Sequence, residues 1–443
     1  PHAIWRWFYA LNQIPRASKK EEQVTAFIVD FAKNHQLNYQ TDELGNVLVS
    51  KKIQGQPNYD KPIVLQAHLD MVHQKNANTD FDFDKDPIAM YVEGDWVKAK
   101  GTTLGADNGL GVAAMLAVLS DTEISHPPIE ALFTIDEETG MTGAKTLNTN
   151  WLTGDYLLNL DTEEDDEIGI GCAGGVDVTA RKSYPTKSIA KAQKAYKLSV
   201  NGLNGGHSGM DIHKGLGNAN VLLTRILYAL LPTQIELISI RGGNLRNAIP
   251  REAAAKFYCF EDDVEKLFDL IKNDINNEYR LLEPLLNISL ESKTSTDGAI
   301  AKHDSRRLIE SLRSIPNGVH RMSPSVEALV ETSNNLARVV VDLGKVEIAC
   351  LTRSSVESSK EDLVQIISSG LNLEQFEVSL SGDYPGWEPI NDSKPVRCLA
   401  AVYRNLFKEE PKIAACHAGL ECGIIGSKYP AMQMASFGPT IKG

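Results

Sequence analysis

The fold is decided by the stretch Lys61-Pro62-Ile63-Val64-Leu65-Gln66-Ala67-His68-Leu69-Asp70-Met71-Val72. Its apolar run from Ile63 to Ala67 is typical of a buried strand, so His68 and Asp70 fall where the strand leaves the sheet. The period of two in a strand puts both side chains on the same side, where His68 can bind a metal while Asp70 orients its imidazole. The alternative is a polar strand end that faces solvent, because so short a motif also arises from composition alone.

Length and composition restrict the class of protein. A chain of 443 residues is expected to form two or three domains at about 150 residues each. Hydrophobic residues at 42% and charged residues at 23% are typical of a soluble globular protein, and no apolar run reaches the roughly 18 residues that a membrane span needs. The net charge of −13 argues against a nucleic-acid partner, because that binding draws on clustered Lys and Arg.

The six cysteines are scattered along the chain and form no Cys-x-x-Cys pair. Their spacing argues against both a thiolate zinc site and a disulfide framework. The first residues also lack the basic start, the apolar centre and the cleavage site of a secretory signal. We therefore expect a cytoplasmic protein with no membrane segment.

Two helices are expected before the first strands. Residues Ile4 to Leu11 form a short aromatic segment, and Ser18 followed by Glu21 is a capping-box signature for the start of the next helix. That second segment repeats apolar residues at helical spacing, namely Val24, Phe27, Ile28 and Phe31.

Carboxylates follow two further predicted strands. Ile129 to Ile135 ends in Asp136-Glu137-Glu138, and Tyr156 to Leu160 ends in Asp161. Apolar strands separated by helical segments predict a mainly parallel sheet, which places the ends of its strands at one edge. Several acidic groups that converge with His68 need a cation to offset their repulsion.

A glycine-rich segment, Gly101 to Gly109, precedes a predicted helix from Leu110 to Leu119. Asp107 lies at the mouth of this helix, where its carboxylate could bind a metal. The structural alternative is an N-cap, because Asp and Asn are favoured there and the glycines permit tight turns.

The pattern changes after residue 187. Alternating strands and helices continue to about residue 390, and no sequence repeat is strong enough to indicate a duplication. We predict an α/β catalytic domain made of residues 1–187 and 391–443, with a mainly parallel sheet and helices on both faces. Residues 188–390 are predicted to form an inserted α+β lid and substrate domain.

The converging side chains His68, Asp107, Glu138 and Asp161 are nitrogen and oxygen ligands without thiolate, which suits zinc, manganese or cobalt. Two divalent ions are expected, because a carboxylate such as Asp107 can bridge them and the pair can activate a water. Glu137 precedes Glu138 and can point at that water, which predicts a general base.

These motifs resemble the di-zinc peptidase family that includes carboxypeptidase G, aminoacylase and several dipeptidases. The resemblance covers essentially the whole chain and is strongest to the bacterial aminoacyl-histidine dipeptidases of that family. It rests on His68-Leu69-Asp70, Gly101 to Gly109, Asp136 to Gly140, Gly205-Gly206-His207-Ser208-Gly209, Arg246 to Glu252, Pro316 to Val319 and His417 to Gly423.

The resemblance implies specific roles at the metal centre. His68 and Asp161 would bind one ion, Glu138 the other, and Asp107 both, while Asp70 supports His68 and Glu137 acts as base. The family's final ligand, a His that follows a Gly-Pro-Thr stretch, is expected beyond Gly443.

The resemblance also implies substrate residues. His207 would stabilise the oxyanion, in some relatives across a dimer, although a His between glycines is otherwise a turn residue. Asn247 would contact the substrate, and His417 and Glu421 are assigned to substrate binding or to the architecture of the site.

We therefore expect a metal-dependent dipeptidase, a homodimer that hydrolyses small unblocked dipeptides including Xaa-His. One alternative is an amidohydrolase of the same family that acts on N-acylated amino acids. The other is a catalytically silent, metal-dependent binding protein of the same fold.

Overall fold

The computed structural model describes residues 2–187 and 191–442, which form two compact units. The first unit comprises the chain up to Gly171, Trp387–Ala415 and the chain from Leu420, and the second comprises Cys172–Gly386 and Cys416–Gly419. The division at residues 171/172 differs from the expected one at 187/188, because strand β9 (Gly174–Ser183) pairs with strands of the second unit. Residue 188 lies outside the described residues.

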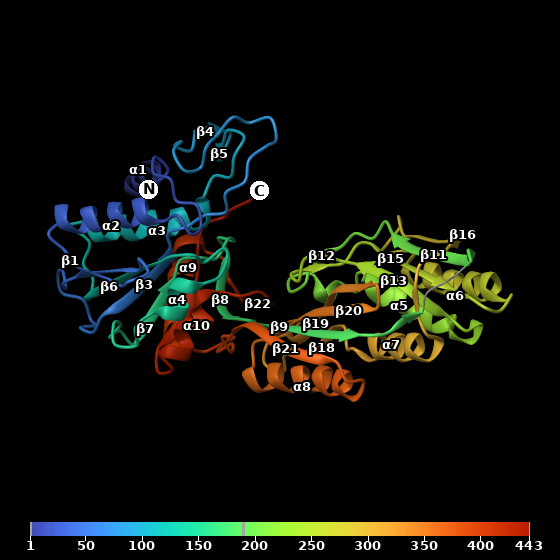
Figure 1. Cartoon of the computed structure of the whole chain (residues 1–443). Helices are drawn as coiled ribbons and strands as arrows, with labels where there is room; N and C mark the ends of the chain where they lie inside the picture. Colours follow the sequence, from blue (N-terminus) through green and yellow to red (C-terminus); the bar gives the residue numbers. More distant parts are fainter. Residues whose placement is uncertain (1, 188–190, 443) are drawn as a thin grey trace. The chain divides into compact units, whose positions relative to one another are not determined.

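The first unit is organised around an eight-stranded sheet (Figure 1). Its four central strands, in the order β6-β3-β7-β23, are parallel, and β1, β2 and β8 add antiparallel pairs. The predicted α/β class is confirmed, and the parallel part is this centre. In sheet order the strands are β1 (Asn38–Thr41), β2 (Val47–Lys51), β6 (Ile129–Thr134), β3 (Ile63–His68), β7 (Tyr156–Asn159), β23 (Gln433–Ser436), β8 (Glu167–Cys172) and β22 (Lys412–Cys416).

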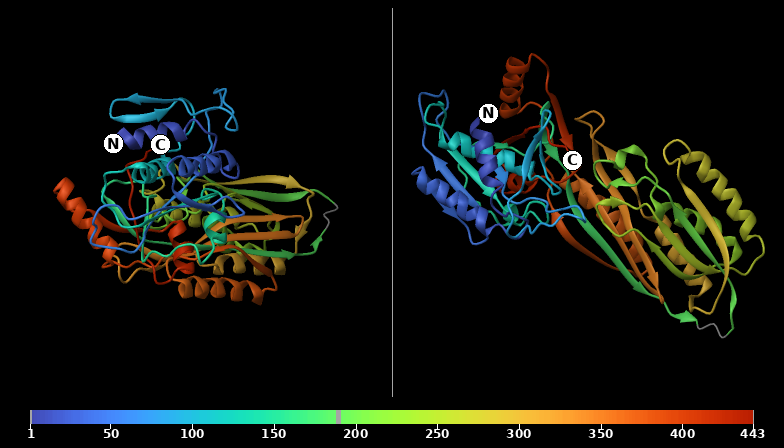
Figure 2. Two further views of the ribbon diagram at one scale, coloured as in Figure 1. Left: turned by 90° about the vertical axis from the view of Figure 1, so that its left-hand side faces the viewer. Right: turned by 90° about the horizontal axis from the view of Figure 1, so that it is seen from above.

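Helices lie on both faces of this sheet. Apolar residues of α2 and α3 pack with alternate residues of β2, β3 and β6 in one buried cluster, and α1 packs along α3. The other face is covered by α4, α9 and α10, as Figures 1 and 2 show. The helices are α1 (His2–Leu11), α2 (Glu22–Asn34), α3 (Ala106–Ser120), α4 (Thr142–Thr146), α9 (Lys394–Phe407) and α10 (Glu421–Lys428), and a hairpin of β4 (Met90–Glu93) and β5 (Trp96–Ala99) lies apart from the sheet.

The second unit contains two βαββαβ halves with the same strand order. In each half the fourth strand pairs with the first, the first with the third, and the third with the second, all antiparallel. One half is β11 (Gln193–Asn201), α5 (Ala219–Ala229), β13 (Glu236–Gly242), β15 (Ala253–Tyr258), α6 (Val264–Tyr279) and β16 (Asn287–Ser295). The other is β9, α7 (Lys302–Ser314), β19 (Val330–Asp342), β20 (Lys345–Ser354), α8 (Glu357–Leu373) and β21 (Glu377–Tyr384).

The two halves join edge to edge into one sheet, because β13 pairs antiparallel with β19. The half that begins with β11 is inserted between β9 and α7 of the other half. Alternate residues of the strands and the inner faces of α5, α6, α7 and α8 form one core, so the helices cover one face of the sheet. The topology therefore shows a repeat that the sequence pattern did not indicate.

The remaining elements of the second unit are short. They are β10 (Thr186–Lys187) paired with β17 (Ala299–Ile300), β12 (Gly206–His207) paired with β14 (Ala248–Ile249), β18 (Gly318–Met322) on β19, and the 3-10 turns η1 (Ile212–Lys214) and η2 (Leu231–Thr233). Within residues 2–187 and 191–442, no helix has both the length and the apolar character to cross a membrane.

Candidate active site

The ends of three parallel strands bring the predicted metal ligands together. His68 is the last residue of β3 and lies in register with Thr134 of β6, and Gln66 lies in register with Asn159 of β7. The residues that follow β6 and β7, Glu138 and Asp161 among them, therefore emerge at the same edge of the sheet as His68.

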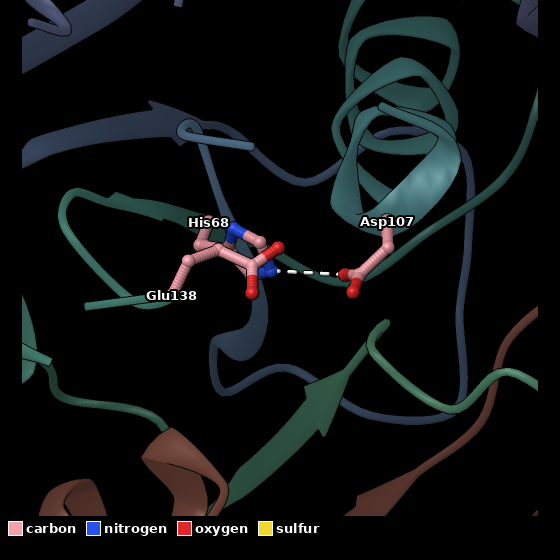
Figure 3. Close-up of side chains that lie close together, drawn as sticks. All are labelled: His68, Asp107 and Glu138. Carbon is pink, nitrogen blue, oxygen red and sulfur yellow. Dashed lines mark hydrogen bonds and ion pairs between the residues drawn. The ribbon is translucent and has the colours of Figure 1, made fainter. Parts of the chain in front are cut away.

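The ligand atoms converge around the imidazole of His68. Its Nε2 lies 3.0 Å from Oδ1 of Asp107 and 3.4 Å from Oδ1 of Asp161. Donor atoms of His68, Asp107 and Glu138 all lie within 4.8 Å of one another, and Figure 3 shows these three side chains pointing toward a common centre. A nitrogen and several carboxylate oxygens at such distances can bind one or two divalent cations.

Asp107 does not cap its helix with its carboxylate. Helix α3 spans Ala106–Ser120, but Asp107 and Asn108 are non-helical, so the regular helix begins after them, and among the described residues no N–H group of its first turn donates to Asp107. Asp107 itself is non-helical, so its carboxylate turns to His68 while the amide of Asn108 donates to Asp161. The capping alternative is therefore wrong, and Asn108 is a positioning group that the sequence did not single out.

Asp70 holds the other side of the His68 ring. Its Oδ1 lies 3.2 Å from Nδ1 of His68 and accepts the backbone N–H of Glu137 at 3.0 Å, while Ser18 Oγ donates to Oδ2 at 2.8 Å. Burial alone would raise the pKa of Asp70, but the hydrogen bond and charge of His68 outweigh it and lower that pKa to about 2. Asp70 is thus a charged acceptor that fixes the tautomer of His68.

The expected capping box of Ser18 and Glu21 is wrong. Neither side chain caps α2, because Ser18 is bound to Asp70 and the Glu21 carboxylate accepts the N–H groups of Lys19 and Asp136. Both side chains instead make tertiary contacts, Ser18 with the loop that follows β3 and Glu21 with the loop that follows β6.

Burial, together with neighbouring carboxylates, raises the pKa of three acidic groups of the site, Glu137, Glu138 and Asp161. Burial, and then the charge of Asp107, raise the pKa of Glu138 to about 7. Burial raises the pKa of Asp161 to about 6 against the opposing charge of His68, and burial raises the pKa of Glu137 well above its usual value. A cation would relieve this repulsion, so the donor set fits the divalent metals that the sequence predicts.

Glu421 lies at the start of α10 in the first unit and is fully buried. Its Oε2 accepts hydrogen bonds from Gln66 Nε2 at 2.7 Å and from Thr134 Oγ1 at 2.6 Å. Gln66 in turn accepts from Asn159 Nδ2, so Glu421 is bound directly to β3 and β6 and is linked to β7 through Gln66. Burial raises its pKa to about 8.

The second unit holds His207, Asn247 and His417 in another polar cluster. Nδ1 of His207 accepts the N–H groups of Gly209 and Met210 at 3.2 and 3.0 Å, so its Nε2 carries the hydrogen of the neutral ring. Burial and the charge of Arg353 lower the pKa of His207. The carbonyl of Asn247 accepts the N–H of Ser208 at 2.7 Å, which places Asn247 beside His207.

Arg353 is a residue of this cluster that the sequence reasoning missed. Arg353 is 5% exposed and its guanidinium donates to the Tyr384 hydroxyl at 2.8 Å, but among the described residues it forms no ion pair within 4.0 Å. Nearby, Nε2 of His417 forms a hydrogen bond of 2.7 Å with Ser333 Oγ. Burial and the charge of Arg353 lower the pKa of His417 to about 3. The signal in the sequence was an arginine that closely follows the apolar run Ile348 to Leu351 of strand β20.

A search for related proteins gives the family. The model of peptidase family M20/M25/M40 matches residues 64–443. The chain belongs to this family. The resemblance inferred from the motifs is therefore confirmed, and the protein is a peptide-bond hydrolase.

Two proteins match this M20/M25/M40 peptidase over its full length. The cytosol non-specific dipeptidase of Escherichia coli strain K12 is 43% identical and covers 100% of this chain and 92% of its own. The crystal structure of the aminoacylhistidine dipeptidase of Vibrio alginolyticus has 42% identity, a TM-score of 0.92, and covers 100% of this chain and 91% of its own. An aminopeptidase PepT structure from Bacillus cereus, at 14% identity and TM-score 0.56, shares the fold.

Proposed function

We propose that this chain hydrolyses the peptide bond of small unblocked dipeptides, including Xaa-His, with two divalent ions. The observation that carries the proposal is the convergence of His68, Asp107, Glu138 and Asp161 at one sheet edge. The substrate class is supported by the two full-length relatives, which are a non-specific dipeptidase and an aminoacylhistidine dipeptidase.

Four side chains would hold the metals. His68 and Asp161 would bind one ion, Glu138 the other, and Asp107 both, with zinc as the expected metal and cobalt or manganese compatible with the same donors. When bound, two such ions polarise a scissile carbonyl and make water a stronger nucleophile. Asp70 would keep the His68 ring in the tautomer whose Nε2 is free to bind.

Glu137 would be the general base. It would take a proton from the attacking water and pass it to the leaving amine, as a carboxyl with a raised pKa can do. Its backbone N–H is bound to Asp70, so the base and the support of His68 are held by one carboxylate.

His207 would donate Nε2–H to the oxyanion of the tetrahedral species. A neutral ring whose Nδ1 is occupied by two backbone N–H groups is a fixed donor, which is what such a role needs. We propose that the second unit is a lid whose closure brings His207 and Asn247 to the substrate.

Arg353 would bind the free carboxylate of the dipeptide. A buried guanidinium with an unpartnered Nε offers a charge-assisted hydrogen bond to an anion. His417 would position the neighbouring strand through Ser333, and Glu421 would support the three ligand strands, so we assign both to the architecture of the site.

The same resemblance leaves two weaker alternatives. An amidohydrolase of N-acylated amino acids would prefer N-acetyl amino acids to carnosine-like dipeptides, and an assay of both substrate classes separates the two activities. A catalytically silent binding protein would hold metal but hydrolyse neither class. Both full-length relatives are described as dipeptidases, which favours the first proposal. A homodimer in the cytosol, the compartment named for the Escherichia coli relative, is part of the same proposal.

The Glu137→Gln variant tests the mechanism. We expect the metal content to stay near that of the wild type and turnover to fall by about 10² to 10⁴, the range for loss of a general base. Metal analysis and turnover are measured on the same preparation.

The matched variants are Glu138→Gln, which should lose metal, and the exposed Glu164→Gln, which should behave as the wild type. Wild-type turnover in the Glu137→Gln protein would refute the assignment of the base.

A further inference from the structure

An N-terminal segment, residues 12–21, lies against the loops that carry the metal ligands. Asn12 Nδ2 donates to the carbonyl of Leu104, the carbonyl of Arg16 accepts from Met71 N, and Ser18 binds Asp70. This segment precedes residue 64, where the match to the family model begins. The loops that carry the candidate ligands are therefore held by a segment that lies outside the matched residues.

Arg16 is the centre of this segment. Its side chain is 2% exposed, and its Nη1 donates to the carbonyls of Leu69 and Asp70 at 3.1 and 3.2 Å. Its Nη2 donates to Asn12 Oδ1 at 3.2 Å and to the carbonyl of Gly105. One guanidinium thus joins the end of the His68 strand to the loop that precedes Asp107.

The glycine-rich segment leaves room for this guanidinium. A Cβ added at Gly109 would lie 2.6 Å from Arg16 Nη2, and a Cβ at Gly105 would collide with the same nitrogen. Gly105 also has a positive φ, so a side chain there would be strained in any case. Both glycines are therefore explained by the position of Arg16.

The guanidinium carries a buried charge beside acidic groups. Among the residues that the structure describes it forms no ion pair within 4.0 Å, yet the charges of Asp70, Asp107 and Glu138 act on it. Burial lowers the pKa of Arg16 to about 10 against the opposing effect of these carboxylates, so the group stays protonated at neutral pH.

We infer that Arg16 is a positioning residue of the metal centre. It clamps the Asp107 loop to the His68 strand end and offsets part of the carboxylate charge, so that the ligands are held together before a metal binds. The inference rests on the proposed two-metal function. With Asp70, Asp107, Glu137, Glu138 and Asp161 ionised, two divalent cations together with Arg16 balance the charge of the site.

The test compares Arg16→Met, which removes the charge at similar length, with Arg16→Lys, which keeps it. The exposed Arg6→Met, in α1, is the matched control. Apparent Zn²⁺ affinity is measured by competition with a chromogenic chelator, and thermal midpoints are measured for metal-free and Zn²⁺-loaded protein. We expect Arg16→Met to weaken affinity by about 10- to 100-fold, as for groups that support metal ligands. Arg16→Lys should recover part of the loss, and Arg6→Met should match the wild type.

Wild-type Zn²⁺ affinity in a folded Arg16→Met protein would overturn the inference, and so would equal losses in the Lys and Met variants. If Arg16→Met does not fold, the Arg16→Lys variant decides alone. A loss of Zn²⁺ affinity in Arg16→Lys as large as that in the ligand variant His68→Ala would overturn the role of the charge. Failure of the wild type to bind two ions would instead refute the proposed function.

Discussion

The metal centre of the first unit and the polar cluster of the second unit are opposites in charge. Burial raises the pKa of Glu138 and Asp161 in one and lowers the pKa of His207 and His417 in the other. In both places burial disfavours the charged form of the side chain. The first region has an excess of carboxylates, whereas the second contains the guanidinium of Arg353. The first region therefore favours a cation, and the second favours an anion.

Under the proposed function, the free carboxylate of a dipeptide would bind Arg353, and its scissile carbonyl would bind a metal ion held by the carboxylates. Variants that remove one side chain from either region show whether the two regions contribute to substrate binding or to turnover.

Loss of His207 should have the largest effect in the second unit. We expect His207→Ala to lower kcat by about 10² to 10³, the range for loss of one oxyanion donor, with metal content unchanged. Steady-state kinetics and metal analysis on one preparation check this. Normal turnover in His207→Ala would exclude the catalytic role.

A mixing experiment then distinguishes delivery of His207 within one chain from delivery by a partner. If it comes from a partner subunit, mixed dimers of Glu137→Gln and His207→Ala would regain part of the activity. No recovery after subunit exchange has been confirmed would reject the partner route.

Removal of the Arg353 guanidinium from the second unit should change substrate binding more than turnover. We expect Arg353→Met to raise KM for a dipeptide by about 10- to 100-fold, because truncating one partner of a buried charge pair costs at least 2 kcal/mol. A dipeptide amide, which lacks the free carboxylate, should lose little when the same variant is compared with the wild type. Equal losses for both substrates would contradict carboxylate binding by Arg353.

The smallest effect, a change of stability with pH, should differ in sign between the two regions of the metal-free protein. In the first unit the pKa values of Glu138 and Asp161 in the folded protein, about 7 and 6, lie above the ordinary 4.5 and 3.8. Their contribution to the free energy of unfolding is therefore present at low pH and is lost as the pH rises through 6 to 7. In the second, the pKa of His417 falls from 6.5 to about 3, so its contribution is present above pH 6.5 and is lost as pH falls.

Amide hydrogen exchange, corrected for intrinsic rates, checks both signs in one sample. Peptides from β3 and β6 should be more protected at pH 5 than at pH 8, and peptides from β19 more protected at pH 8. Loading with Zn²⁺ should remove the first trend and leave the second. A common sign in both units would refute the electrostatic contrast.

The strand ends of the metal centre were predictable because their signal is local. An apolar run predicts the strand, and the residue that follows it within a few positions, His68 or Asp161, is the candidate ligand. Asp107 was ambiguous from sequence, since a residue at a helix mouth can cap or coordinate, and the structure places its carboxylate at His68 instead of at the helix N–H groups.

The partners of these ligands were not predictable, because they come from distant segments. Ser18 and Glu21 have the spacing of a capping box, but Asp70 and the N–H of Asp136 compete successfully for their side chains. The similarity of the two halves of the second unit also lies in strand order, which needs no repeated sequence.

The order of strands in the first unit has a consequence for synthesis of the chain. Strand β23 (Gln433–Ser436) is inserted between β7 and β8, so the edges of β7 and β8 that face it stay open until β23 has been made. At roughly 5 to 20 residues per second, the stretch from Asn159 to Gln433 takes about 14 to 55 s. During that interval the nascent first unit exposes unpaired edges of β7 and β8, while every strand of the second unit is translated and can pair before β23 emerges. The second unit can thus fold on the ribosome while the sheet that carries the metal ligands is still incomplete.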